Sequence, residues 1–346
     1  MNKNLSSLML IYTGGTIGMK QDPAEGVLSP FDFSQIQEEV PEIRKFAFRT
    51  DSYTFDPLID SSDVDPAMWQ SLAKLIEEKY DDYDGFIILH GTDTMAYSAS
   101  ALSFMLDHLT KPVIFTGSQL PVGVPRTDGK ENLISAAEIA SAKDAYGHAM
   151  VPEVCILFDS KLIRGNRSTK INAESFDAFR SPNLPPLAEA GINIRYNKDL
   201  IIKPSDWDAP LIASTALDTS VAILKIHPGI TRQTVSDVLG GSNTRAVIIE
   251  TYGSGNAPTA PWFLECVREA DRSGKVLVNV TQCLKGTVDM GLYATGKALR
   301  DAGVISGMDI TTEGALAKLF HLLGTHKENG IVKKLMGCNL KGEISK

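Results

Sequence analysis

Short apolar runs alternate along this chain with segments of helical periodicity, and that alternation is typical of a parallel sheet with crossover helices. Seven runs predict buried strands, at 8–12, 86–89, 113–115, 154–158, 222–226, 246–249 and 276–280. Apolar spacing of about 3.6 residues predicts helices at 65–76, 95–106, 231–239, 262–273 and 315–323. The first helix has the clearest start, because Asp65 stands at the cap position and Pro66 in the first turn.

A stretch with little periodicity, 196–218, separates two such alternating series. We interpret it as the link between two α/β domains with mainly parallel sheets. The expected division is a larger N-terminal domain at 1–195 and a smaller, Rossmann-like C-terminal domain at 219–346. A length of 346 residues suits two domains of roughly 100–200 residues each.

The charge balance is acidic, with 34 Lys and Arg against 42 Asp and Glu and a formal net charge of -8. Such a chain is a poor general binder of nucleic acid or of an anionic membrane. The four cysteines stand far apart without a C-x-x-C pair, which fits reduced thiols. No apolar run approaches the roughly 18 residues of a membrane span, and the run at 8–11 is too short for a signal-peptide core. We therefore expect a cytoplasmic protein without a nucleic-acid or membrane partner.

Polar clusters follow the predicted strands of the first half, and the carboxyl ends of parallel strands meet at one edge of a sheet. These clusters lie at 13–18, 60–63, 90–94, 116–119 and 159–170. Hydroxyl residues are concentrated in them, namely Thr13, Thr16, Ser61, Ser62, Thr92, Thr94, Ser118 and Thr169. For any single one, a turn or a helix cap is the ordinary explanation. The clusters also hold the acid Asp93 and the amine Lys170, so this edge is a candidate catalytic site.

Several familiar chemistries lack their residue patterns in this chain. The loop Gly14-Gly15-x-x-Gly18 has neither dinucleotide nor phosphate-loop spacing, no G-x-S-x-G elbow is present, and the six histidines have no metal-ligand spacing. What remains is a threonine or serine nucleophile, which needs an adjacent base. Lys170 serves as that base only when deprotonated, and His90 fits a packed strand-end role better than that of the base. Backbone N–H groups in the glycine-rich turns suit an oxyanion, so this set favours acyl transfer.

The motifs Thr13-Gly-Gly-Thr16-Ile-Gly18 and His90-Gly-Thr-Asp-Thr94 closely resemble the two signatures of the bacterial-type L-asparaginases. The resemblance covers essentially the whole chain, continuing at 60–63, 83–85, 111–112, 116–118, 181–186, 252–258 and 281–283. Asp60-Ser-Ser-Asp63 and the lack of a leader are similar to the cytosolic, type I branch. The secreted branch usually has Gln where this chain has Ser62.

The resemblance implies catalytic roles for four residues. Thr16 matches the primary nucleophile, which attacks the side-chain amide carbon. Thr92 matches a second catalytic threonine, and Asp93 with Lys170 completes a Thr–Lys–Asp relay. The implied reaction converts L-asparagine into L-aspartate and ammonia by double displacement through a β-aspartyl ester of Thr16. A solvated surface lysine is the alternative role for Lys170.

The resemblance also implies how a substrate is held. Asp60, Ser61 and Ser62 match substrate-binding positions, of which the two serines hold the α-carboxylate. Asp93, together with Thr92, matches the binding set as well, and its carboxylate holds the α-ammonium. Ser118 matches a position whose backbone faces the leaving amide. Asn256 matches a residue that reaches a neighbouring subunit's site, although capping of the following helix explains it equally.

No cofactor and no metal belong to the implied mechanism, and the implied assembly is a homodimer or homotetramer. Two departures from the family pattern stand out. Family members often carry a tyrosine on a mobile lid about ten residues after the nucleophile. Here Val27 lies near that position, and Glu25 is the nearest reactive side chain. An effector site in some type I enzymes uses an arginine where this chain has Glu250, and this departure speaks against control by asparagine.

Two other functions stay open from the sequence. The first is the amidase part of a tRNA-dependent amidotransferase, whose relatives carry a further domain before the first motif. The second is a non-catalytic amino-acid sensor on the same fold, which would predict the loss of a reactive group. The preference for asparagine over glutamine is also open, because one methylene changes binding by only about 1–3 kcal/mol.

Overall fold

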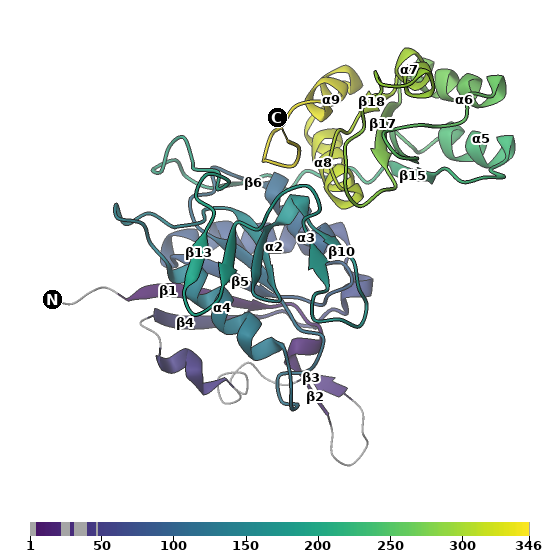
Figure 1. The fold of residues 1–346 in the computed structure, drawn as a ribbon. Coiled ribbons are helices and arrows are strands. Elements are labelled where there is room, and N and C mark those ends of the chain that lie inside the picture. The colour runs from purple at the N-terminus through teal and green to yellow at the C-terminus, as the bar shows by residue number, and fades with distance from the viewer. Residues whose placement is uncertain (1–4, 22–27, 31–39, 46–47, 346) are drawn as a thin grey trace. The chain divides into compact units, whose positions relative to one another are not determined.

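The apolar runs of the first half become neighbouring strands of one sheet (Figure 1). The computed structural model describes residues 5–21, 28–30, 40–45 and 48–345, and its contacts divide the chain into two units. Unit 1 comprises Met1–Ser181 and Pro185–Thr215, and unit 2 comprises Pro182–Leu184 and Ala216–Lys346. Each is an α/β unit with a mainly parallel sheet, so the predicted fold class is confirmed.

An eight-stranded sheet forms the centre of unit 1. Its order is β13 (Ile194–Tyr196), β12 (Ala188–Ala190), β9 (Lys161–Arg164), β8 (Val154–Phe158), β7 (Val113–Thr116), β5 (Gly85–Leu89), β1 (Ser6–Tyr12) and β4 (Phe48–Thr54). Neighbours run parallel from β4 to β8, and β9, β12 and β13 continue the sheet antiparallel. The strands β5, β7 and β8 are buried along their whole length, as continuous apolar runs require. All four strands predicted in this half are present, and the antiparallel extension has no counterpart among the predictions.

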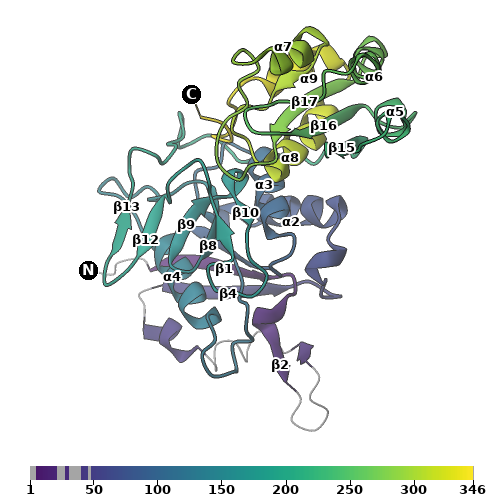
Figure 2. The same ribbon diagram turned by 45° about the vertical axis from the view of Figure 1, so that its right-hand side comes forward.

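Helices cover both faces of this sheet. Figure 2 shows α4 (Gly129–Ser141) on one face and α2 (Pro66–Glu78) with α3 (Met95–Met105) on the other. The connections β5–α3–β7 and β7–α4–β8 step across the sheet in the same direction. Because their helices lie on opposite faces, the two crossovers have opposite hands, and one of them is of the rare left-handed kind.

Helix starts differ in how well the sequence predicts them. Helix α2 begins as expected, with the Asp65 carboxylate accepting from the backbone N–H of Met68 at 3.1 Å. Thr94 stands at the N-cap of α3, but its hydroxyl makes no capping bond. Helix α4 has no predicted counterpart, and its N-cap residue Asp128 makes no capping bond either.

Shorter elements complete unit 1. Three two-stranded pairs are β2 (Met19–Gln21) with β3 (Leu28–Pro30), β6 (Leu106–Asp107) with β14 (Ile212–Ala213), and β10 (Thr169–Lys170) with β11 (Phe179–Arg180). The 3-10 helices are η1 (Thr16–Gly18), η2 (Pro41–Lys45), η3 (Ser61–Asp63), η4 (Tyr80–Asp82) and η5 (Gly165–Arg167).

The register of the parallel strands places their ends at a common level. Tyr12, the last residue of β1, pairs with Thr54 of β4 and with Leu89 of β5. Leu89 in turn pairs with Thr116 at the end of β7. The loops that follow these four strands therefore leave the sheet side by side.

Unit 2 has a parallel sheet of β15 (Val221–Lys225), β16 (Ala246–Thr251), β17 (Val276–Thr281) and β18 (Ile305–Ser306). Its helices are α5 (Arg232–Gly240), α6 (Pro261–Arg272), α7 (Ala294–Asp301), α8 (Thr312–Thr325) and α9 (Asn329–Met336). Side chains of β16 alternate between two cores: Val247 and Ile249 join the cluster with α5 and α6, and Ala246 and Ile248 join the one with α8 and α9.

The expected link at 196–218 differs in position from the boundary between the units. Tyr196 ends β13, and β14 pairs with β6 of the same unit, so unit 1 extends to Thr215. Residues Pro182–Leu184 belong to unit 2, because Asn183 bonds to the backbone of Gly286 in both directions. Most of the irregular segment 196–218 therefore packs as part of unit 1 and does not form a free linker.

A buried ion pair anchors the C-terminal segment of unit 2. Lys318 of α8 and Glu343 are both fully buried, with Nζ 2.6 Å from Oε1. The ammonium also donates to the carbonyls of Met336 and Cys338, and the carboxylate accepts from the backbone N–H of Leu340. Each charge thus has hydrogen-bond partners in addition to the other charge.

Glu343→Ala should lower the free energy of unfolding of unit 2 by about 3–5 kcal/mol, because it leaves the Lys318 ammonium buried without its counter-charge. Urea unfolding followed by circular dichroism measures the change. The matched control is Glu189→Ala, which breaks the exposed pair with Arg195 and should cost less than about 1 kcal/mol. Equal effects of the two substitutions would contradict the structural role of the buried pair.

Candidate active site

Glycines allow the loops after β1, β4 and β5 to touch through their backbones. Gly14 and Gly15 have φ of 133° and 93°, in the region that disfavours side chains. A Cβ on Gly14 would lie 2.1 Å from the carbonyl oxygen of Ile59, and one on Gly15 would lie 2.5 Å from Cα of Gly91. Thr16 and Thr92 directly follow Gly15 and Gly91, so this contact brings the two predicted threonine loops together.

Thr16 is half-buried and begins the 3-10 helix η1. The preceding turn is tied to the sheet by Thr13, whose hydroxyl donates to the carbonyl of Leu89 at 3.0 Å. Beneath it, the Tyr12 phenol donates to the carbonyl of Gly15 at 3.4 Å. Burial raises the pKa of Tyr12 to about 12, which keeps that phenol protonated and able to donate.

The loop after β4 is organised around Asp60 and Ser61. Asp60 accepts from the backbone N–H and the hydroxyl of Ser62, both at 2.8 Å, and these bonds lower the pKa of its carboxyl. Ser61 is buried, and its Oγ accepts from the backbone N–H of Asp93 at 3.3 Å. The Thr94 hydroxyl donates to the carbonyl of Ser61 at 2.6 Å, which explains why it does not cap α3. These bonds join the serine loop to the loop that carries Thr92 and Asp93.

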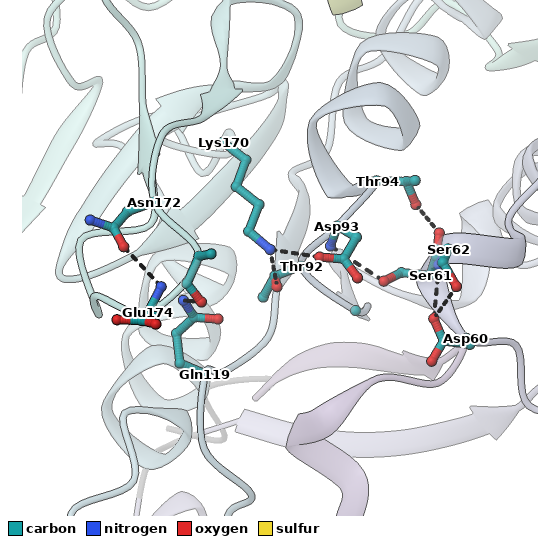
Figure 3. Close-up of polar contacts among 12 residues, drawn as sticks. Asp60, Ser61, Ser62, Thr92, Asp93, Thr94, Gln119, Lys170, Asn172 and Glu174 are labelled. Atoms are coloured by element: carbon teal, nitrogen blue, oxygen red, sulfur yellow. Dashed lines mark hydrogen bonds and ion pairs between the residues drawn. The ribbon is translucent and has the colours of Figure 1, made fainter.

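Lys170 connects the two residues with which the sequence groups it. Its Nζ lies 2.8 Å from Oγ1 of Thr92 and 2.7 Å from Oδ1 of Asp93 (Figure 3). The lysine side chain is 19% exposed and that of Asp93 is 62% exposed, so the amine is the sheltered partner. The alternative of a solvated surface lysine does not fit these contacts.

Ser118 and Asn256 take no part in these hydrogen bonds. Ser118 is buried after β7, and among the described residues its Oγ has no hydrogen-bond partner. Asn256 lies in unit 2, where its Oδ1 accepts from the hydroxyl of Thr295 at 2.5 Å. The capping alternative for Asn256 is wrong, because the N-cap of α6 is Ala260, without a side-chain bond.

His90 is a packed structural residue, as its sequence position suggests. It is fully buried, with Nδ1 2.7 Å from the carbonyl of Gly91 and Nε2 3.0 Å from Oγ of Ser98. Ser98 also accepts from the indole N–H of Trp69 at 2.8 Å. Burial lowers the pKa of His90 to about 4, so the imidazole is neutral near pH 7 and donates from Nδ1.

Two side chains after β7, those of Asp128 and Asn132, belong to the site's framework and are absent from the predicted set. The Asp128 carboxylate accepts from the backbone N–H of Gln119 at 3.0 Å and of Leu120 at 3.2 Å. Asn132 donates to the carbonyl of Gly117 at 3.0 Å. In a sequence, an Asp at the start of a helix is the signal that could have identified Asp128. Its carboxylate does not cap α4, however, and instead accepts hydrogen bonds from the loop that precedes the helix.

Of the two departures from the family pattern, the structure describes the one at Glu250 and not the one near Val27. Val27 and Glu25 lie outside the described residues. Glu250 lies at the end of β16 and accepts from the hydroxyl of Thr312 at 2.7 Å, with Nζ of Lys225 3.4 Å away. A carboxylate with these partners has the opposite charge to the arginine of that effector site.

Two searches of the described residues concern metals and membranes. Residues 5–21, 28–30, 40–45 and 48–345 hold no group of three or more His, Cys, Asp or Glu placed to ligate a metal ion. In the same ranges, no helix combines the length and the apolar character that a membrane crossing needs.

Comparisons with known proteins give matches along both halves of the chain. The family model described as "Asparaginase, N-terminal" matches residues 7–202, and "Glutaminase/Asparaginase C-terminal domain" matches residues 220–336. The chain is 45% identical to "L-asparaginase 1" of Escherichia coli (strain K12), over 98% of each chain. It is 34% identical to one of the subunits of the glutamyl-tRNA(Gln) amidotransferase of Thermococcus kodakarensis, over 99% of this chain and 77% of the relative.

Among solved structures, the crystal structure of L-asparaginase I from Vibrio cholerae matches with a TM-score of 0.89 and 42% identity. The alignment covers 99% of this chain and 100% of the other. The thermostable L-asparaginase from Thermococcus kodakarensis matches with a TM-score of 0.88 and 31% identity, over 98% of this chain and 99% of the other.

The buried neutral state of His90 predicts loss of stability in acid. Its folded pKa of about 4 lies below the unfolded value near 6.5, so the unfolded chain binds the proton first. The free energy of unfolding should therefore fall as pH drops from about 6.5 to about 4, by up to about 3 kcal/mol from this residue. His90→Gln, which does not titrate, should show a shallower decline in urea unfolding across that range. Parallel pH profiles for the two proteins would rule out this role.

Proposed function

Because the chain belongs to the asparaginase family, we propose that it is an L-asparaginase, which hydrolyses L-asparagine to L-aspartate and ammonia. One observation carries the proposal: Lys170 Nζ bridges Thr92 and Asp93 beside the loop of Thr16. Since Nζ donates to Oγ1 of Thr92, the proton of the Thr92 hydroxyl is left to point toward a ligand. That arrangement suits proton transfer at a threonine.

Binding of the substrate uses complementary charges at one edge of the sheet. We propose that Ser61 and Ser62 hold the α-carboxylate and that Asp93, whose side chain is largely exposed, holds the α-ammonium. Asp60 supports this pocket by fixing Ser62 with two hydrogen bonds. We also propose that the backbone of Ser118 faces the leaving amide, as the family resemblance implies.

The proposed reaction has two displacement steps. In the first, Thr16 Oγ attacks the side-chain amide carbon, its proton passes to the nitrogen, and ammonia leaves a β-aspartyl ester. In the second, the relay of Thr92, Lys170 and Asp93, with the Lys170 amine in its deprotonated form, takes a proton from water, which attacks the ester. The proton returns to Thr16, and L-aspartate is released. Backbone N–H groups in the glycine turns hold the oxyanion, which lowers the barrier by about 3 kcal/mol.

The setting of this reaction is part of the same proposal. The enzyme acts without cofactor or metal in the cytoplasm, as a homodimer or homotetramer whose Asn256 contacts a neighbouring subunit's site. The similarity to part of a glutamyl-tRNA(Gln) amidotransferase keeps the tRNA-dependent amidase as the second candidate. The net charge of -8 speaks against a tRNA partner, and copurification with tRNA would favour it. The presence of all four reactive groups speaks against a sensor without turnover.

Thr16→Ala should abolish ammonia release from L-asparagine, because no other hydroxyl is proposed to form the ester. The assay compares L-asparagine with L-glutamine for the native protein and the variant. Thr219→Ala is the control, since that threonine is exposed in unit 2. Turnover that survives Thr16→Ala would move the nucleophile to Thr92. If the native protein binds asparagine without turnover, the non-catalytic amino-acid sensor becomes the supported function.

Lys170→Met should lower kcat about 10²–10⁴-fold, because it removes the amine of the relay while keeping the length of the side chain. The KM for asparagine should change little, since Lys170 is not among the proposed substrate contacts. Lys297→Met, at an exposed position, is the control. Steady-state kinetics measure both constants, and a change confined to KM would assign Lys170 to binding instead.

A further inference from the structure

Lys170 is carried by a small hairpin outside the eight-stranded sheet. Strands β10 and β11 have two residues each, and Lys170 pairs with Phe179. A two-stranded pair of this size is marginally stable by itself. Buried η5 fixes the chain just before the hairpin, so the loop at 171–178 is the end that needs a further anchor.

Gln119 supplies that anchor from the loop after β7. Its Nε2 donates to the carbonyls of Ala173 at 3.2 Å and of Ser175 at 3.0 Å, at the turn of the hairpin (Figure 3). The backbone of Gln119 is itself held by the two carboxylate oxygens of Asp128, each at 3.0 Å. The donor therefore comes from a fixed segment and reaches a weakly supported one.

We propose that Gln119 is a positioning residue, which holds the hairpin so that Lys170 reaches Thr92 and Asp93. The inference rests on the proposed function for its kinetic consequence. Nζ of Lys170 meets its two partners at 2.8 and 2.7 Å, so a small displacement of the hairpin breaks both contacts. Misplacement of a catalytic group by about 1 Å can lower a rate about 10²-fold.

The turn has its own internal support, which provides a second way to loosen it. Oδ1 of Asn172 accepts from the backbone N–H of Glu174 at 2.8 Å and of Ser175 at 2.9 Å. Asn172 stabilises the turn from within, and Gln119 binds the turn to the loop after β7. Both residues should therefore act on Lys170 through the same segment.

Gln119→Met tests the proposal, because it keeps an unbranched side chain and removes both donated bonds. Hydrogen exchange should become faster at Ile171, whose N–H bonds to Ala178 across the hairpin at 2.8 Å. With asparagine, kcat should fall about 10–100-fold while KM stays within about twofold. The control is Gln233→Met, which removes an exposed helix-surface amide bonded to Asp237.

The outcomes separate three possibilities. A rise in KM with unchanged kcat would make Gln119 a substrate contact and overturn the proposal, as would unchanged exchange and kinetics. If Gln119→Met does not fold, Asn172→Ala decides, since it should give the same pattern of faster exchange and lower kcat with little change in KM. If the native protein does not release ammonia, the proposed function fails, but the exchange measurement still tests the anchor.

Discussion

Backbone contact between the strand-end loops is the constraint on which the rest of the site depends. Gly14, Gly15 and Gly91 let these loops approach to distances that no side chain would permit. Ser61 then fits against Gly91, and its Oγ bonds to the N–H of Asp93. Thr16 and Thr92 are thus placed by the absence of side chains beside them as much as by any bond that they form.

The layer beneath these loops is polar but neutral. His90 and Tyr12 are buried groups whose pKa values are displaced so that neither carries a charge near pH 7. Each donates a hydrogen bond to a glycine carbonyl of the loops above it. The charged groups, Lys170 and Asp93, lie in the layer above, where a zwitterionic substrate would meet them. Because His90 and Tyr12 are neutral, the buried layer adds no further ion beside the charges of Lys170 and Asp93.

The sequence predicts the parts of this molecule that rest on local patterns. Continuous apolar runs identify the buried parallel strands, and Asp65 with Pro66 identifies the start of α2. Strands β4, β9, β12 and β13 are missed, because β4, β12 and β13 are half-exposed or exposed and the short buried strand β9 has only two apolar residues between charged ends. Thr92, Asp93 and Lys170 lie in contact, and each is predicted as a candidate site residue from its hydroxyl, acid or amine chemistry at a strand end. Gln119 is not, because its contacts are with main-chain carbonyls of a distant hairpin, and no local pattern encodes those.

The order of the elements along the chain has a consequence for how activity arises in time. Strand β1 leads directly to Thr16, yet β1 lies between β4 and β5 and the amine of Lys170 follows 154 positions later. During synthesis at about 5–20 residues per second, Thr16 therefore precedes Lys170 by about 8–30 s. The waiting threonine is chemically quiet, because its loop lacks the neighbours that shape it. If the proposed mechanism holds, a nascent chain without Lys170 does not hydrolyse amides, and recovery of turnover on refolding should report the last long-range contacts to form.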